Sequence, residues 1–117
     1  MADGITIYIN PKCSKCRLSL ALLKEKNVTA EIVEYLTTPP DRRQLSEILD
    51  LLKLEPRELM RTFEAPYTEL NLDNENLSRD DLIQAMIENP ILIERPIVIN
   101  GNKATIGRPP EKILDIL

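Results

Sequence analysis

One stretch near the start of the chain decides the fold: Ile5-Thr6-Ile7-Tyr8-Ile9-Asn10-Pro11-Lys12-Cys13-Ser14-Lys15-Cys16. Its first five residues are β-branched or aromatic, which predicts a buried strand, and Asn10-Pro11 marks the end of that strand. Good helix formers then run from Lys15 to Lys26. The C-x-x-C pair therefore lies in the first turn of a helix that directly follows a buried strand.

The residues after this turn complete a βαβ unit. Apolar residues cluster at helical spacing in the predicted helix: Leu18, Ala21, Leu22 and Leu23. The segment Ala30–Tyr35 then predicts a second strand. A strand, a helix and a strand within about 30 residues form a right-handed unit whose two strands are parallel.

The middle of the chain, from about 41 to 89, is predicted to be helical throughout. Asp41 with Gln44 resembles a capping box at the start of one helix. The apolar residues of that helix follow at i, i+3, i+4 and i+7: Leu45, Ile48, Leu49 and Leu52. Proline and serine start signals predict two further helices, one over 56–60 and one over 78–89.

The last part of the chain predicts a hairpin and a final helix. The β-branched segments 97–99 and 104–106 flank a turn-rich link, and Pro109-Pro110-Glu111 begins the helix. The order is thus β-α-β, a helical insertion, then β-β-α. We expect one α/β domain over 1–117 with a mixed sheet, which is the order of the thioredoxin fold with an enlarged middle connection.

Composition excludes several classes of function. A chain of 117 residues with net charge −4 and 43% hydrophobic residues is typical of one soluble globular domain, with no bulk positive field for nucleic acid or an anionic membrane. No apolar run approaches the roughly 18 residues of a membrane span, and residues 1–10 do not resemble a secretory signal, so we expect a cytoplasmic protein. The absence of histidine excludes His-based triads and metal sites.

Cys13 is the candidate nucleophile. A helix N-terminus presents unpaired N–H groups and a positive dipole end, which favour a thiolate. Lys12, Lys15 and Arg17 add positive charge around it. A structural disulfide is a poor interpretation in a chain with no sign of export. The competing hypotheses are that both cysteines fill the core, or that they bind zinc, for which two cysteines and no histidine are too few ligands.

The role of Cys16 stays open between two hypotheses. It is either a resolving thiol that forms a disulfide with Cys13, or a residue whose S–H stabilises the Cys13 thiolate. Three arginines form the other candidate set, because Arg61, Arg95 and Arg108 lie outside the apolar stripes. Guanidinium groups bind a tetrahedral oxyanion through forked hydrogen bonds, although spacing alone does not show that the three converge.

Several segments carry a resemblance to a known family: Tyr8–Cys13, Tyr35–Pro40, Glu58–Arg61, Asn89–Val98 and Ile106–Pro109. In this order, and over essentially the whole chain, they resemble the glutaredoxin-linked arsenate reductase family. The resemblance implies a thioredoxin-like fold with a helical insertion.

The same resemblance implies a reaction and its residues. Cys13 would attack arsenate, with Arg61, Arg95 and Arg108 around the oxyanion. Glutathione would act as a co-substrate, glutaredoxin would clear the mixed disulfide, and no tightly bound cofactor or metal is expected. The predicted supporting residues are Asn10, Lys12, Arg17 and Pro96.

Two positions depart from the family pattern. Members of the family often carry histidine at the place of Ile9 and a small hydroxyl residue at the place of Cys16. The second thiol keeps two alternatives open. One is a general C-x-x-C thiol-disulfide oxidoreductase, and the other is a redox-sensing regulator of the Spx type that binds RNA polymerase.

Overall fold

A computed structural model describes residues 4–117. Its elements follow the predicted order, and the helical insertion contains four α-helices and a 3-10 turn. The elements are β1 (Ile5–Ile9), α1 (Ser14–Glu25), β2 (Ala30–Glu34), α2 (Arg42–Leu52), α3 (Pro56–Leu59), α4 (Ala65–Glu69), α5 (Arg79–Glu88), η1 (Pro90–Leu92), β3 (Ile97–Asn100), β4 (Lys103–Ile106) and η2 (Pro110–Ile116). The predicted α/β class is confirmed.

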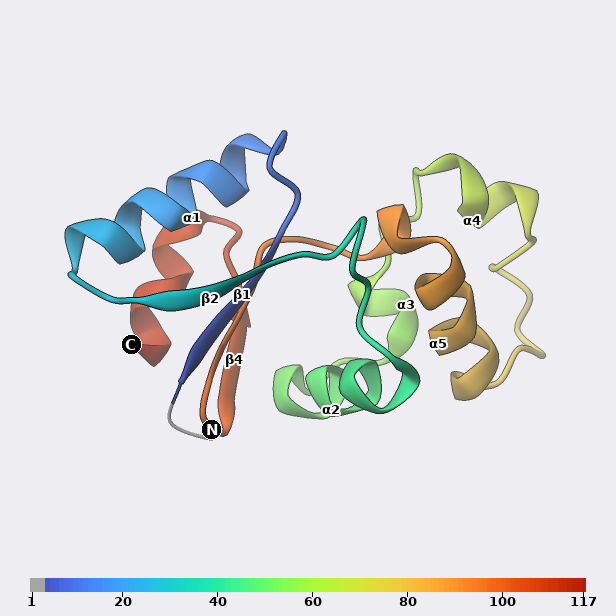
Figure 1. Ribbon diagram of the computed structural model, residues 1–117. Helices are drawn as coiled ribbons and strands as arrows, with labels where there is room; N and C mark the ends of the chain where they lie inside the picture. The colour runs from blue at the N-terminus through green and yellow to red at the C-terminus, as the bar shows by residue number, and fades with distance from the viewer. Residues whose placement is uncertain (1–3) are drawn as a thin grey trace. The chain divides into compact units, whose positions relative to one another are not determined.

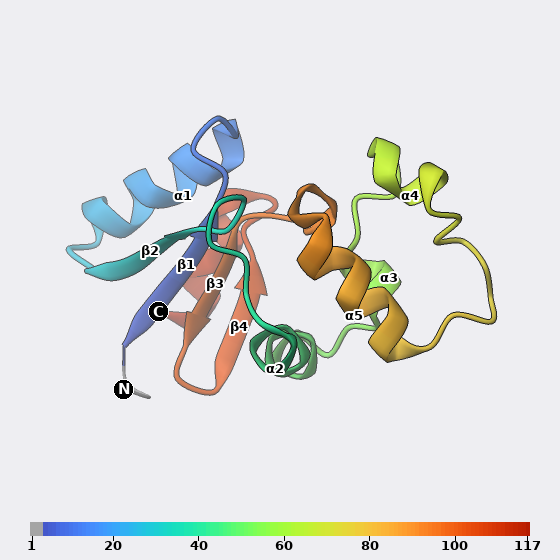
Figure 2. The ribbon, with the colours of Figure 1, turned by 45° about the vertical axis from the view of Figure 1, so that its right-hand side comes forward.

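The four strands form one mixed sheet in the order β2-β1-β3-β4. β1 pairs with β2 in parallel, whereas the β1–β3 and β3–β4 pairs are antiparallel (Figures 1 and 2). Ile9, the last residue of β1, is opposite Glu34, the last residue of β2. Because parallel strands end at the same edge of a sheet, the segments that follow Ile9 and Glu34 leave from one edge.

The described chain divides into two compact units. The first contains the sheet with α1 and η2, and it is built from residues up to Thr38 and from Arg95 onward. The second is Pro39–Glu94, which contains the predicted helical insertion. The chain thus leaves the first unit after β2 and returns to it immediately before β3.

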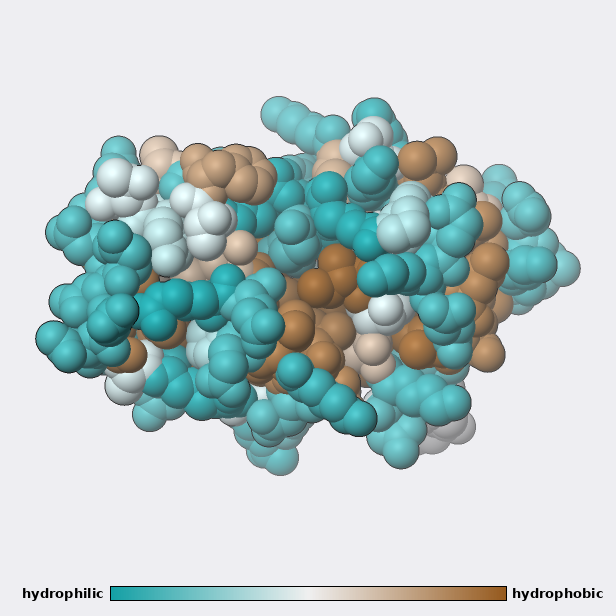
Figure 3. Space-filling model, turned by 180° about the vertical axis from the view of Figure 1, so that it is seen from behind, coloured by the Kyte–Doolittle hydropathy of each residue, from teal (hydrophilic) through white to brown (hydrophobic). Residues whose placement is uncertain are grey.

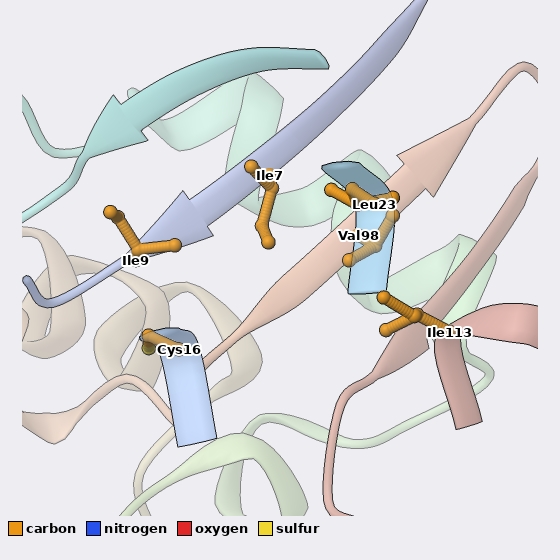
Figure 4. Packing of buried hydrophobic residues seen from close by; sticks show 6 residues of the cluster. All are labelled: Ile7, Ile9, Cys16, Leu23, Val98 and Ile113. Atoms are coloured by element: carbon orange, nitrogen blue, oxygen red, sulfur yellow. The ribbon is translucent and has the colours of Figure 1, made fainter. Parts of the chain in front are cut away.

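One apolar core holds the first unit together. α1 and η2 lie on the same face of the sheet, and their side chains meet those of β1 and β3 (Figure 4). Its buried members are Ile7, Ile9, Cys16, Leu23, Val98 and Ile113. Burying a large aliphatic side chain of this kind stabilises a fold by about 1.5–3 kcal/mol.

The buried face of α1 differs from the apolar cluster seen in the sequence. Cys16, Ser19 and Leu23 are the buried residues of this helix, whereas Leu18 is 52% exposed. The sheet selects the face that continues from Cys16 at i+3 and i+7, and Leu20 and Leu22 are partly buried against the same core. The fully buried Ser19 is therefore a residue that hydrophobicity alone does not find.

The helices of the second unit begin as their sequence signals predict. Asp41 and Gln44 form the predicted capping box of α2, and Leu45, Ile48 and Leu49 are its buried residues. Ser78 caps α5 through a bond from the backbone N–H of Asp81. The final helix, η2, is a 3-10 helix rather than an α-helix.

Figure 3 shows a largely hydrophilic face with smaller hydrophobic areas between the polar residues. No helix within residues 4–117 combines the length and the hydropathy needed to span a bilayer.

Candidate active site

Cys13 occupies the N-cap position of α1, with an extended backbone conformation. Its backbone N–H donates to the Asn10 carbonyl oxygen at 2.9 Å, and its own carbonyl oxygen accepts from the Arg17 N–H at 3.1 Å. The main chain therefore fixes Cys13 at the end of the helix where N–H groups point outward. Anionic groups are stabilised at this position.

Asn10 builds the turn between β1 and α1. Its side-chain Oδ1 accepts from the Lys12 N–H at 3.0 Å, and its own N–H donates to the Cys16 Sγ at 3.5 Å. An asparagine that bonds the backbone two residues further on stabilises a tight turn. Asn10 therefore supports the position of both cysteines through backbone and sulfur contacts.

Two of the three candidate arginines lie at Cys13. The Arg108 Nη2 donates to the Cys13 Sγ at 3.5 Å, and the Arg108 Nε donates to the Arg95 carbonyl oxygen at 2.7 Å. The Arg95 guanidinium also hydrogen-bonds Cys13. Arg95 is only 7% exposed, and its Nη1 donates to the Tyr35 hydroxyl at 3.4 Å. Two guanidinium groups thus contact one sulfur.

The environment of Cys13 lowers the pKa of its thiol from 9.0 to about 7. Partial burial acts in the opposite direction and is the largest single effect, because it disfavours the charged form. It is outweighed by hydrogen bonds to the thiolate from the N–H and the thiol of Cys16, the Arg95 side chain and the Lys15 N–H. A large fraction of Cys13 is therefore ionised at neutral pH.

Cys16 is shifted in the opposite direction. Its pKa is raised from 9.0 to about 11, mainly by burial and also by the neighbouring Cys13, against the lowering effect of the Asn10 N–H. Its side chain is fully buried, at 0% exposed. Of the two thiols, Cys16 keeps its proton and shares it with the Cys13 sulfur in a hydrogen bond.

The predicted cationic surroundings of Cys13 need a correction. Lys12 and Arg17 are exposed to solvent, where screening weakens their effect on a thiolate. The groups that lower the pKa of Cys13 are instead backbone N–H groups, the Cys16 thiol and Arg95, which lies far away in the sequence. The lowered pKa of Cys13 agrees with the sequence analysis, whereas a contribution from Lys12 and Arg17 stays a prediction.

The third candidate arginine, Arg61, belongs to the second unit and is engaged there by acidic and aromatic partners. Its Nη1 donates to Glu94 at 2.7 Å and its Nε donates to Glu64 at 3.1 Å. Its guanidinium carbon lies 4.6 Å from the centre of the Phe63 ring. Only 12% of the Arg61 side chain is exposed.

Pro96 and Gly107 hold the two arginine-bearing segments together. The Gly107 N–H donates to the Pro96 carbonyl oxygen at 2.9 Å, and the Arg95-Pro96 and Arg108-Pro109 peptide bonds are both cis. A Cβ at position 107 would lie 2.8 Å from both the Pro96 Cγ and the Ser19 Oγ. Only glycine therefore fits between α1 and the segment that carries Arg95.

Sequence reasoning missed Tyr35, Ser19 and Gly107. Tyr35 was predicted as the last residue of a strand, but it lies one residue beyond β2, fully buried and bonded to Arg95. A large aromatic residue at the carboxyl end of a strand next to a break was the available signal. For Gly107, the available signal was a glycine placed between a predicted strand and Arg108-Pro109.

The arrangement suits nucleophilic attack by sulfur on an oxyanion. A thiolate lies beside guanidinium groups that can hold negative oxygens in fixed directions. Within residues 4–117, no three potential ligands among Cys, Asp and Glu are grouped for a metal ion.

The mixed sheet, the helices α1 and η2 packed on one of its faces and the cysteine at the β1–α1 turn define a thioredoxin-like protein. The sequence model of the ArsC family matches residues 8–116, and the chain belongs to this family.

Similar proteins extend over the whole chain. The uncharacterized protein YfgD of Escherichia coli (strain K12) is 52% identical over 118 residues, covering 100% of this chain and 99% of YfgD. An arsenate reductase of Neisseria meningitidis (strain Z2491) is 47% identical over 114 residues, 97% of each protein. The solved structure of an arsenate reductase from Vibrio cholerae matches with a TM-score of 0.95 and 47% identity, covering 100% of both chains.

Proposed function

We propose that this protein is an arsenate reductase whose nucleophile is Cys13. The observation that carries the proposal is a thiol with a pKa of about 7 that two guanidinium groups contact, at a helix N-terminus. Proteins named arsenate reductases are 47% and 48% identical to the chain over 97% of its length. This combination favours a small oxyanion substrate over a general disulfide substrate.

The first step joins sulfur to arsenic. The Cys13 thiolate attacks arsenic(V), an S–As bond forms, and one As–O bond breaks. The departing oxygen leaves as water after it takes up a proton. Arg95 and Arg108 would hold the remaining oxygens, because their fixed donors compensate the negative charge as it redistributes.

The second step is the reduction, with glutathione as the proposed reductant. Its thiolate attacks the Cys13 sulfur, an S–S bond forms and the S–As bond breaks. The electron pair of the broken bond stays on arsenic, which leaves as arsenic(III) in arsenite. Glutaredoxin would then take the glutathione from the mixed disulfide and return Cys13 as a thiolate.

The decisive experiment is an arsenate-dependent assay. Purified protein with glutathione, glutaredoxin, glutathione reductase and NADPH should consume NADPH only when arsenate is added, with one arsenite formed per NADPH. Cys13→Ser is the matched control and should abolish both signals. If the wild-type protein gives no arsenate-dependent consumption, the proposed function is wrong.

Arg61 remains the predicted third arginine of the oxyanion site. Its Nε and Nη1 are paired with Glu64 and Glu94, so an anion bound through it would lie beside two carboxylates. Arg61→Lys keeps the charge and loses the forked geometry. Kinetics with a raised KM for arsenate would support the role, whereas unchanged kinetics would remove Arg61 from the site.

A second candidate function, a dithiol oxidoreductase, is favoured by one observation. The Cys13 and Cys16 sulfurs are hydrogen-bonded to each other, so they are close in space. Against it, Cys16 is fully buried with a raised pKa, and a resolving thiol must become a thiolate to attack. We therefore propose that Cys16 donates its S–H to the Cys13 thiolate.

Two substitutions of Cys16 separate these roles. Cys16→Ser keeps a hydrogen-bond donor, so turnover with glutathione and glutaredoxin should stay within about threefold of wild type. Cys16→Ala removes the donor and should raise the pKa of Cys13, measured by alkylation against pH. Complete loss of turnover in Cys16→Ser would instead identify Cys16 as the resolving thiol.

A further inference from the structure

Tyr35 lies where the two parallel strands end. It directly follows Glu34, the last residue of β2, which pairs with Ile9 at the end of β1. The chain beyond Ile9 leads into the turn that carries Cys13. Tyr35 therefore starts from the same edge of the sheet as the candidate nucleophile, although the two residues are far apart in the sequence.

The Tyr35 side chain is fully buried, and its hydroxyl oxygen is 3.4 Å from the Arg95 Nη1. Arg95 is itself 93% buried, since only 7% of it is exposed. A buried guanidinium needs hydrogen-bond acceptors to offset its lost hydration, and the tyrosine hydroxyl supplies one. The contact thus constrains a side chain that also bonds the Cys13 sulfur.

The acceptor that Tyr35 provides for Arg95 is a hydroxyl and not a carboxylate. A tyrosine hydroxyl is neutral at physiological pH, so it orients the guanidinium without cancelling its charge. Arg61 shows the contrasting arrangement, because its guanidinium is paired with the carboxylates of Glu64 and Glu94. The Tyr35 hydroxyl thus contacts the Arg95 guanidinium without adding a carboxylate charge beside it.

We propose that Tyr35 is a positioning residue whose hydroxyl orients the Arg95 guanidinium toward the Cys13 sulfur and so sets the reactivity of the thiolate. This inference rests on the proposed function only in taking Cys13 as the nucleophile. In this role Tyr35 acts through Arg95, which its hydroxyl contacts.

The test is Tyr35→Phe, which keeps the buried ring and removes only the hydroxyl. The readout is the rate of Cys13 alkylation by iodoacetamide against pH, which needs no arsenate. We expect the midpoint to rise by about half a pH unit, so that alkylation at pH 6 is about threefold slower. Tyr67→Phe, a partly exposed tyrosine of α4, is the matched control and should leave the midpoint unchanged.

A second comparison separates positioning from a general structural effect. In an Arg95→Met background the guanidinium is absent, so Tyr35→Phe should cause no further shift of the midpoint. An unchanged midpoint in Tyr35→Phe alone, or an equal shift in both backgrounds, would overturn the inference. Because the readout is alkylation, a failure here is distinct from the absence of arsenate reduction, which only the coupled assay reports.

Discussion

At the scale of single residues, the two cysteines show how local surroundings give two identical thiols different pKa values. Cys13 lies at a helix end with its sulfur facing guanidinium and N–H donors, whereas Cys16 is one turn further along and fully buried. The first has a pKa of about 7 and the second of about 11. This difference in pKa supports the proposed roles of Cys13 as the nucleophile and Cys16 as a hydrogen-bond donor.

The pH dependence of Cys13 follows from the lowered pKa. The reactive form is the thiolate, so the alkylation rate should rise with pH through about 7 and reach a plateau by about 8.5. Iodoacetamide labelling followed by mass spectrometry measures it. One cysteine should be modified in the folded protein and two after denaturation. A midpoint at or above the reference value of about 8.5 would contradict the assigned environment.

Arg108 makes two directed bonds that lysine cannot reproduce. Its Nε holds the Arg95 carbonyl oxygen while its Nη2 contacts the Cys13 sulfur. Arg108→Lys should lower kcat/KM for arsenate by about 10- to 100-fold, with little change in stability. Arg43→Lys, whose side chain is 88% exposed, is the control and should be unaffected. Equal kinetics in both variants would exclude Arg108 from the oxyanion site.

At the scale of elements, α1 packs against the sheet and carries the proposed nucleophile, Cys13, as its N-cap residue. The residues Cys16, Ser19 and Leu23 set its rotation, because they are the buried ones. A helix rotated so that Leu18 faced the core would carry Cys16 out of it. The packing of α1 therefore helps to decide which of its two thiols is protected from solvent.

Two leucines of α1 test this rotation. Leu23 is 3% exposed and Leu18 is 52% exposed. Leu23→Ala should cost about 2–5 kcal/mol of unfolding free energy, because it leaves a cavity in the core, whereas Leu18→Ala should cost less than about 0.5 kcal/mol. Urea unfolding followed by circular dichroism measures both. Similar losses in the two variants would show that the burial of α1 has been assigned to the wrong face.

The sequence predicted elements where local rules decide the structure. β1 has the predicted bounds Ile5–Ile9, and the Asp41 capping box is present. Such features depend on neighbouring residues, so a single sequence carries them. The buried face of α1 depends instead on which side of the helix meets the sheet. Of the predicted apolar cluster, Leu23 is buried and Leu22 packs against the core, whereas Leu18 is exposed.

The sequence predicted the chemical groups of the candidate site, but it did not predict which side chains contact one another. The position of Cys13 followed from a strand, a turn and a helix. The contacts of Arg95 with Tyr35 and of Arg108 with Cys13 join residues 60 and 95 positions apart, and no spacing rule specifies them. The pairing of Arg61 with Glu94 could not be predicted for the same reason, because the two residues are 33 positions apart.

At the scale of the whole molecule, the thiolate environment belongs to one unit. The groups that lower the pKa of Cys13, together with Arg108, all lie within residues up to 38 and from 95 onward. The helical unit, Pro39–Glu94, is stabilised by its own caps and core. Stability and thiol reactivity should therefore respond separately to changes in the two units.

Asp41→Ala tests that separation. It removes the capping box of α2 and should lower the free energy of unfolding by about 1 kcal/mol. The midpoint of Cys13 alkylation should remain that of the wild type, because no group that sets it has changed. Thermal unfolding and alkylation of the same preparation supply both readings. A shifted midpoint would contradict the assignment.

The backbone hydrogen bonds of Cys13 matter because its sulfur would be covalently modified during the proposed reaction cycle. Its amide and carbonyl are both tied, to Asn10 and Arg17, through bonds that leave the side chain out. In the proposed cycle the Cys13 sulfur is bonded first to arsenic and then to glutathione, and it finally returns to the thiolate. The backbone hydrogen bonds of Cys13 therefore do not depend on which group is bonded to its sulfur. That group can change while the start of α1 stays intact.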